Sequence, residues 1–208
     1  MTVPDEHEIT EAERNDLAAR AAHIGKEASD LIRDPKSRVT KLPTPFFHDG
    51  AVYQVTSNMP ARPVVFTIGA AGRDFATMLA QNPSGFFQLG TNAGLSIGSP
   101  ELRLQYAQVF LEATRDFRQR LQILKSASDI ELVPSATQEE KAHHTALLDK
   151  YESTIRPPHV SPIVPSEVVV YAIVGQDLHE MRLKISNDGT IARSDTVLEK
   201  DLPVAVAR

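Results

Sequence analysis

The chain has 208 residues, of which 41% are hydrophobic and 24% are charged, and its formal net charge is −5 at pH 7. This composition is typical of a globular protein of one domain, and the acidic balance argues against nucleic-acid binding, which usually needs a basic surface. Because the chain contains no cysteine, disulfides, thiolate metal sites and cysteine nucleophiles are excluded, which agrees with a cytoplasmic location.

The sequence predicts neither a membrane segment nor a signal peptide. Residues 1–8 are polar and acidic, unlike the start of a signal peptide, and we expect them to be frayed. The longest uninterrupted apolar run, Val168–Val174, is far shorter than the roughly 20 residues that a membrane helix needs. We therefore expect no contact with a membrane.

A first helix is predicted from Thr10 to Arg33. Thr10 and Glu13 have the spacing of a capping box, and Asp34-Pro35 ends the helix because proline disfavours helical backbone in the residue before it. Small and apolar residues recur along this helix at heptad steps, as in a seam between two helices. We expect this seam to pack on the long helix of the same chain, the alternative being a second copy of the protein. Its members are Leu17, Ala21, Ile24, Ala28 and Leu31.

The segment from residue 34 to residue 98 is expected to contain a connector, short strands and, over residues 69–98, an irregular part rich in glycine. Prolines make residues 34–49 an extended connector. Asn92 and Gly94 tolerate the positive φ of a tight turn and favour a hairpin around them. The expected elements are strands at 51–56 and 64–68, a short helix at 74–81, and a hairpin made of strands 86–91 and 95–97.

The glycine-rich segment 69–98 is the candidate ligand site. Its first residues have the outline of a strand-to-helix turn, where backbone N–H groups attract an anion and an arginine adds a bidentate contact. Its phenylalanines can line a pocket for a small apolar molecule. The alternative is structural, with glycines that serve tight turns and rings that belong to the core. The candidate residues are Gly69, Gly72, Arg73, Phe86 and Phe87.

The longest helical pattern runs from Ser99 to Lys125 and is expected to form the central helix. Ser99 is a good N-cap, and Pro100 suits the first helical position. Apolar residues then recur at three- and four-residue steps, with no glycine or further proline between them. The basic residues near its end are interpreted as a solvated face, with a phosphate-binding patch as the less favoured alternative. They are Arg115, Arg118, Arg120 and Lys125.

A third helix and a proline-rich segment follow. Thr137 and Glu140 form a second capping box, which opens a helix to about Ile155. Residues 156–165 cannot be helical and are expected to form a stiff linker or a laid-down arm. We expect this arm to contribute to an interface through Pro157, Pro158, Pro162 and Pro165.

The C-terminal part predicts a three-stranded antiparallel meander. Its strands are expected at 167–174, 178–185 and 190–198, with a hairpin turn at Asn187–Gly189. The first strand is apolar on both faces, as a central strand is. Residues 199–208 form a tail that is either loose or docked on a neighbour.

No complete catalytic set is visible in the sequence. Ser96 matches the letters of a nucleophile elbow, Gly-x-Ser-x-Gly, but the residues before it favour a turn instead of a buried strand. His179 is either a general base or, in the preferred interpretation, a buried core or interface histidine. Glu140 and His143 have the spacing of two metal ligands on one helix face, but no second motif completes a site. We predict no metal and no cofactor.

Together these patterns predict a single α+β domain over residues 1–208, with three helices, the middle one long, and small antiparallel β regions. The favoured function is a non-catalytic interaction protein, an accessory subunit or structural component of a homo- or hetero-oligomeric assembly. Its expected partner is a protein or a second copy of itself, and nucleic acid is not expected. The alternatives are a small-molecule or anion binding protein using segment 69–98 and a serine-hydrolase-like enzyme.

Overall fold

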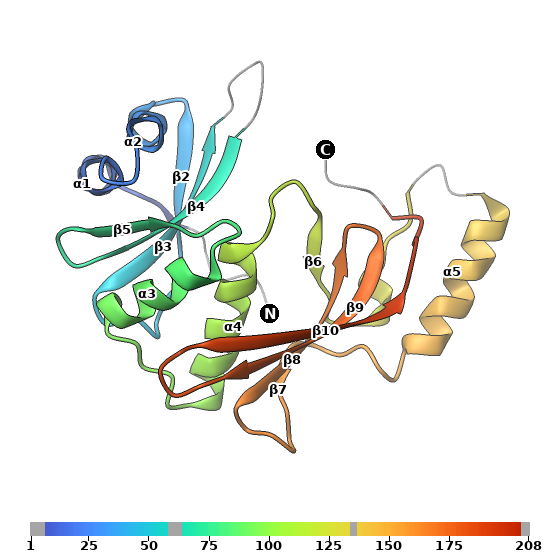
Figure 1. Cartoon of the computed structure of the whole chain (residues 1–208). Coiled ribbons are helices and arrows are strands. Elements are labelled where there is room, and N and C mark those ends of the chain that lie inside the picture. The colour runs from blue at the N-terminus through green and yellow to red at the C-terminus, as the bar shows by residue number, and fades with distance from the viewer. Residues whose placement is uncertain (1–6, 58–63, 134–136, 205–208) are drawn as a thin grey trace. The chain divides into compact units, whose positions relative to one another are not determined.

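The computed structural model describes residues 7–57, 64–133 and 137–204, and it divides the chain into two compact units (Figure 1). The first unit runs to Phe117 and includes Asn187–Thr190, whereas the second comprises Arg118–Ser186 and the residues from Ile191 onward. The described residues form five α-helices and two antiparallel sheets. The α+β class is thus confirmed, but the prediction of three helices with small β regions was wrong.

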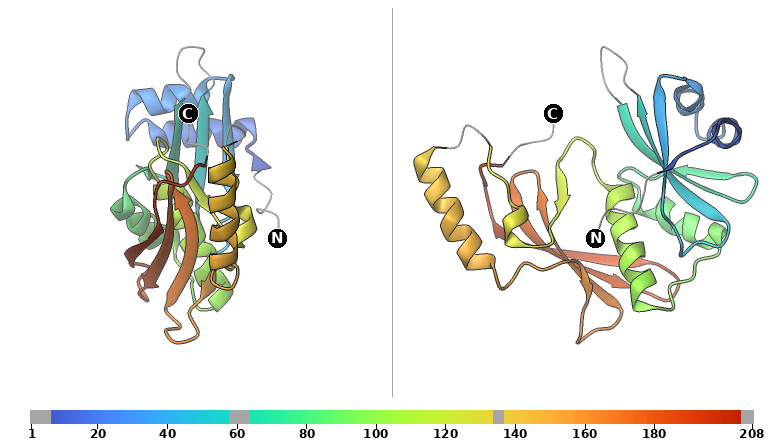
Figure 2. Two further views of the ribbon diagram at one scale, coloured as in Figure 1. Left: turned by 90° about the vertical axis from the view of Figure 1, so that its right-hand side faces the viewer. Right: turned by 180° about the vertical axis from the view of Figure 1, so that it is seen from behind.

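The first unit is an antiparallel sheet with helices on both faces. Its strand order follows the chain, and α1 and α2 lie beside each other on one face of the sheet (Figure 2). Its strands are β1 (His7–Glu8), β2 (Ser37–Leu42), β3 (Gly50–Ser57), β4 (Val64–Ala71) and β5 (Phe75–Met78). Its helices are α1 (Glu11–Ala21), α2 (Lys26–Arg33), α3 (Pro83–Ala93) and α4 (Pro100–Thr114).

Strand β4 shows why both faces of this sheet are covered. Phe66, Ile68 and Ala70 belong to the core that α1 and α2 complete. Their neighbours on β4 point the other way, because side chains alternate along a strand. On that second face a Cβ on Gly69 would meet Leu89 of α3 at 2.6 Å, so the glycine lets α3 approach the sheet.

The second unit is a smaller sheet with one helix. Strand β8 is central, since β9 pairs with one of its edges while β7 and β6 pair with the other. Its apolar residues are buried along both faces, which confirms the predicted central strand. The elements are β6 (Leu121–Ile123), a 3-10 turn (Ala127–Asp129), α5 (Gln138–Tyr151), β7 (His159–Val160), β8 (Glu167–Val174), β9 (Asp177–Ile185) and β10 (Ile191–Glu199).

Helix α5 and the chain after β10 cover one face of the second sheet. Leu147 and Tyr151 of α5 pack with Val169, Tyr171 and Ile173 of β8. The described part of the predicted tail joins the same core, because Leu202 and Val204 are buried there and Leu132 bridges to Val204. Residues 205–208 lie outside the described part of the chain.

The predicted helix over 99–125 was wrong after Thr114. The last carbonyls of α4 bond to other segments: the Thr67 hydroxyl donates to the Ala113 carbonyl at 2.6 Å, and the Gln81 amide donates to the Thr114 carbonyl at 3.0 Å. The Thr114 hydroxyl bonds back to the Phe110 carbonyl. These hydrogen bonds satisfy carbonyls that would otherwise lack a partner at the end of α4, so the helix can end at Thr114. Leu121–Ile123, which was expected to be helical, forms a strand instead.

The predicted helix over 10–33 is broken by a turn at 22–25, which separates α1 from α2. The turn folds α2 back on α1, and the buried Ser29 hydroxyl donates to the Ala18 carbonyl at 2.8 Å. At the N-terminus, His7 and Glu8 are paired with β2 instead of frayed, while residues 1–6 lie outside the described residues.

Three predictions between residues 37 and 97 were also wrong. The expected connector at 34–49 contains strand β2, and the expected helix at 74–81 is strand β5. The expected hairpin at 86–97 is helix α3, because Asn82 caps it and Pro83 occupies its first turn. Gly94, with φ of +69°, ends α3 in the left-handed conformation that glycine tolerates.

Both predicted capping boxes are confirmed. The Thr10 hydroxyl accepts the Glu13 amide, and the Thr10 amide donates to Glu13 Oε2 at 2.9 Å. Thr137 and Glu140 repeat this arrangement at the start of α5. In each box the backbone hydrogen bond from the threonine lowers the pKa of the glutamate.

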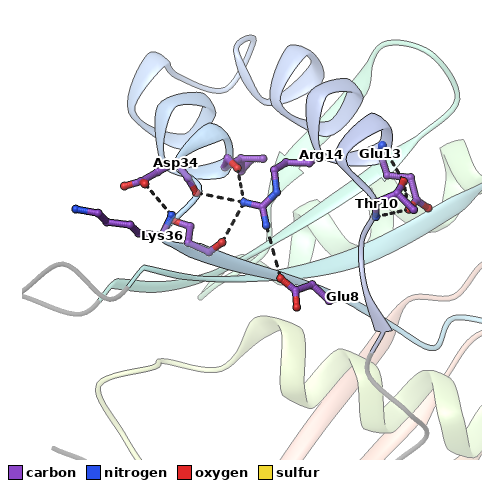
Figure 3. Close-up of polar contacts among 8 residues, drawn as sticks. Glu8, Thr10, Glu13, Arg14, Asp34 and Lys36 are labelled. Atoms are coloured by element: carbon purple, nitrogen blue, oxygen red, sulfur yellow. Dashed lines mark hydrogen bonds and ion pairs between the residues drawn. The ribbon is translucent and has the colours of Figure 1, made fainter.

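Arg14 ties α1, α2 and β2 together (Figure 3). Its Nη1 atom donates to the carbonyls of Ile32, Asp34 and Ser37 at 3.0–3.2 Å, and the side chain is only 15% exposed. Two of these carbonyls lie at the end of α2, where a cation is favourable. Arg14 therefore caps the C-terminal end of α2 and holds the start of β2 beside it.

Candidate interaction surface

Strand β10 is the edge strand of the second sheet. It is nine residues long and pairs with β9, and no other strand among the described residues pairs with it. Both of its faces are exposed over six consecutive residues, Ala192–Val197. Only alternate residues of an antiparallel strand direct their N–H and C=O groups toward the neighbour, so the remaining groups of β10 point outward. Such a row of backbone groups is a template for another strand.

The far end of β10 is fixed by α5. Tyr151 Oη donates to the Leu198 carbonyl at 2.9 Å, and Lys150 Nζ bonds Glu199 Oε2 at 2.8 Å. The hydrogen bond from Lys150 lowers the pKa of the Glu199 carboxyl, so this pair stays charged to a more acidic pH than an ordinary glutamate would. The pairing with β9 shifts between Val197 and Glu199, so the regular part of β10 is Ile191–Val197.

Arg193 and Asp195 are the charged residues of this regular part. They lie two positions apart on the same face, and Arg193 Nε donates to Asp195 Oδ1 at 2.7 Å. Their side chains are 39% and 29% exposed. An ion pair in such a wet position contributes little to stability. The two opposite charges are accessible to a strand placed beside β10.

The turn between β7 and β8 carries an exposed apolar side chain. Ile163 is 88% exposed at this turn. The turn is ordered, because the Glu167 amide donates to the Val164 carbonyl and the Ser161 amide to the Glu167 carbonyl. It lies beyond β8 on the side of the sheet away from β10.

The predicted proline interface lies in this same region. Residues 156–165 are a laid-down arm, because His159 and Val160 pair with β8. Within the arm Pro158 is buried, whereas Pro157, Pro162 and Pro165 are exposed. Pro162 and Pro165 flank Ile163, which was not among the predicted interface residues.

The predicted helix seam packs within the first unit. Leu17 and Ala21 are fully buried against the first sheet, and not against the long helix that the sequence suggested. Ile24, Ala28 and Leu31 are partly buried against the same core. Leu31 also borders a surface hollow of about 580 Å³ beside α2, which Lys26, Glu27, Asp30, Asp34 and Val64 line as well.

The predicted anion-binding residues occupy a strand and a hairpin turn. Gly69 lies inside β4, and Gly72 adopts a φ of +53° in the turn that joins β4 to β5. Arg73 is exposed in the same turn. A strand follows this turn, so the helix N-terminus expected to attract an anion is not formed here.

Phe86 and Phe87 of α3 lie in an aromatic cluster. Phe86 is fully buried and packs edge to face on Phe110 of α4, with 5.4 Å between the ring centroids. Phe87 stacks on the same Phe110 ring, with 5.7 Å between the centroids. Phe86 also contacts the Tyr106 ring at 5.1 Å, and Tyr106 Oη donates to the Gly189 carbonyl at 2.7 Å. Burial raises the pKa of Tyr106, so its hydroxyl stays a donor.

The two candidate catalytic residues belong to different units, Ser96 to the first and His179 to the second. Ser96 follows helix α3 and is exposed. A nucleophile elbow holds its serine on a strained turn after a strand, and Ser96 has neither a preceding strand nor a positive φ. His179 is half-buried on β9 opposite Val197, and its Nδ1 atom is buried without a hydrogen-bond partner.

The described residues contain no cluster of three or more potential metal ligands. His144, next to His143, bonds the Ile130 carbonyl through Nε2 at 2.6 Å. No helix in the described ranges has the length and apolarity needed to cross a membrane.

Sequence reasoning located β10 but not its exposure. The strand expected at 190–198 is present as Ile191–Glu199, and both of its faces are open over Ala192–Val197. The signal for this was present, because Ala192, Ser194 and Thr196 give one face no large apolar side chain and Arg193 and Asp195 charge the other. For Ile163 the signal was its position between Pro162 and Pro165, because a proline-rich segment is too rigid to bend and cover this side chain.

Comparison of the chain with known proteins identifies no similar protein. No protein-family model, curated protein or solved structure matches the chain.

Proposed function

We propose that this chain is a non-catalytic interaction protein, an accessory or structural component that joins a larger assembly through β10. The observation that supports this proposal is the edge strand with six consecutive exposed residues. An added strand bonds to such an edge through the main chain and gains specificity from alternate side chains. The function then depends on a complementary strand in the partner, and the chain itself catalyses no reaction.

The edge is suited to pairing in its ordinary state. The regular part of β10, Ile191–Val197, contains no proline and no lysine, two residues that commonly block a sheet edge, and its two charged residues, Arg193 and Asp195, neutralise each other. Its end is fixed by Tyr151 and Lys150, so a partner strand meets a formed template. Pre-organisation of this kind lowers the entropy that binding must overcome.

A cytoplasmic location belongs to the same proposal. It rests on the cysteine-free composition, which suits a reducing compartment. Fractionation of the source cells, with the chain detected by an antibody, tests it.

Photo-crosslinking in living cells tests the interaction. A photo-reactive amino acid replaces Ser194 in the middle of β10, and a matched control replaces Ala146, which is exposed on α5. We expect a crosslinked protein species from position 194 and none from position 146. Absence of adducts at 194, with the chain folded and expressed, would contradict the proposed function.

A further inference from the structure

We propose that the strand which completes this edge is β10 of a second copy of the chain, antiparallel to the first, with Ser194 of one copy opposite Ser194 of the other. This inference rests on the proposed function, because it names the partner of the same edge. The two sheets then join into one continuous sheet through a two-fold axis, the usual symmetry of a homodimer.

The length of the regular strand sets the register. The pairing of β10 with β9 is continuous from Ile191 to Val197 and then shifts at a bulge. Ser194 is the middle residue of this interval. Antiparallel pairing about Ser194 therefore uses the whole regular strand of both copies and leaves the bulge outside the new ladder.

The charges agree with this register. Pairing about Ser194 sets Arg193 of one copy opposite Asp195 of the other, and the symmetry makes this contact twice. Each arginine also keeps the aspartate of its own strand. The four side chains then alternate in sign on one face of the joined sheet, and opposite charges across a strand pair are stabilising.

The neighbouring symmetric registers are disfavoured. Pairing about Arg193 would set the two arginines opposite each other, and pairing about Asp195 would do the same with the two aspartates. Like charges directly opposite one another destabilise a strand pair. The sequence of β10 thus selects one register among the three.

The apolar residues of β10 agree as well. In the register about Ser194, Ile191 lies opposite Val197 of the second copy. Val197 is 41% exposed and is one of the two large hydrophobic residues exposed in the described part of the chain. On the other face Ala192 lies opposite Thr196, a pair of small side chains that fit closely. Self-pairing therefore covers the exposed valine and sets no charge against an apolar residue.

Charge reversal with exchange tests the pairing in the full-length chain. The variants are R193D, D195R and the double variant R193D/D195R, and the control is K141E, which makes a comparable reversal on the exposed surface of α5. Molar mass is measured by light scattering and analytical ultracentrifugation over a concentration series. Circular dichroism verifies that each variant is folded.

The proposal predicts a distinctive pattern. The wild type and K141E form a dimer, whereas each single variant sets like charges opposite each other and raises the dissociation constant by at least about tenfold. An equimolar mixture of R193D and D195R forms a heterodimer, because every facing pair is then opposite in charge. The double variant restores the homodimer.

Two results would overturn the self-pairing. One is a wild-type chain that stays monomeric at all concentrations, and the other is a set of variants that all dimerise like the wild type. The proposed function fails separately. A crosslink from position 194 to a different protein would contradict the self-pairing but support the interaction role. A monomeric chain that gives no crosslink would contradict both.

Discussion

The edges of the two sheets are built differently. In the first unit the edge strands are short: β1 has two residues, and β5 has four residues that are all partly buried. In the second unit the edge strand β10 has nine residues, and most of them are exposed. Short edges are one of the means by which proteins avoid pairing with other chains.

The difference shows which edge is available to a partner. In the first sheet, β1 pairs with Thr40 and Lys41 on the outer edge of β2. The Val39 carbonyl accepts from the Ile9 amide and the Ser37 carbonyl from Arg14, so little backbone remains to be paired there. The second sheet has its helix over one face, and α5 holds β10 only at its end. We therefore expect substitutions in the interior to change folding and substitutions in β10 to change association.

The largest effect on stability is expected at the central strand. Ile173→Ala on β8 removes a fully buried side chain and should lower the free energy of unfolding by about 2–5 kcal/mol. Val197→Ala on β10 should change it by no more than about 0.5 kcal/mol in dilute solution, while weakening self-association. Urea denaturation and a concentration series measure the two quantities. Equal losses of stability from both variants would show that β10 is not a free edge.

The next largest effect is expected at Arg14. Arg14→Met keeps much of the aliphatic volume but removes the donor shared by three carbonyls, and hydrogen bonds to a charged group contribute about 1.5–3 kcal/mol. We expect a loss of stability in that range, seen in the urea midpoint, with dimerisation of the folded chain unchanged. Arg33→Met, at an exposed position of α2, is the control and should have little effect. A loss of association in Arg14→Met would mean that the two sheets are not independent in this respect.

A smaller effect is expected where α5 holds β10. Tyr151→Phe removes the hydroxyl that donates to the Leu198 carbonyl, and one hydrogen bond of this kind contributes about 1 kcal/mol. Because the end of the strand then frays, we also expect faster amide exchange near Glu199. Unchanged exchange there would show that the strand needs no support from α5.

The smallest effect is expected from the capping boxes that begin α1 in the first unit and α5 in the second. The pKa values of Glu13 and Glu140 are lowered from the ordinary 4.5 by hydrogen bonds from Thr10 and Thr137. Their contribution is present above pH 4.5 and is lost as the pH falls through the lowered values. Thr10→Ala and Thr137→Ala should reduce this acid dependence, which unfolding curves between pH 6 and pH 3 measure. An unaltered pH profile would show that the boxes do not contribute.

Local signals predicted those elements whose boundaries depend on nearby residues. The capping boxes at Thr10 and Thr137 and the hairpin turn at Asn187–Gly189 were visible because each involves side chains within three or four positions. The apolar run of β8 likewise marked a central strand. In these places local preference and tertiary structure agree.

The errors arose where distant residues decide the outcome. Helix α4 ends because Thr67 and Gln81 take its last carbonyls, and nothing in the pattern from Ser99 to Lys125 reveals those partners. The start of α3 was a different kind of error, since a helix was expected to end at residue 81, whereas Asn82 is the N-cap of α3 and Pro83 lies in its first turn. The local chemistry there was sufficient, but its direction was misread.

For the candidate surface, the sequence specified the strand but not its surroundings. Exposure of both faces of β10 depends on where α5 packs, which involves Tyr151 far away in the chain. The self-complementary order of Arg193, Ser194 and Asp195 was present in the sequence, yet it has meaning only once the strand is known to be an edge.

Hydrogen–deuterium exchange of the β10 amides, in dilute and in concentrated solutions of the full-length chain, tests the open edge most directly. We expect alternate amides between Ile191 and Val197 to exchange fast in the dilute chain and to become protected as concentration rises, while exchange of the β5 amides does not change. Equal protection of all β10 amides in the dilute chain, independent of concentration, would contradict it, because the edge would then be closed.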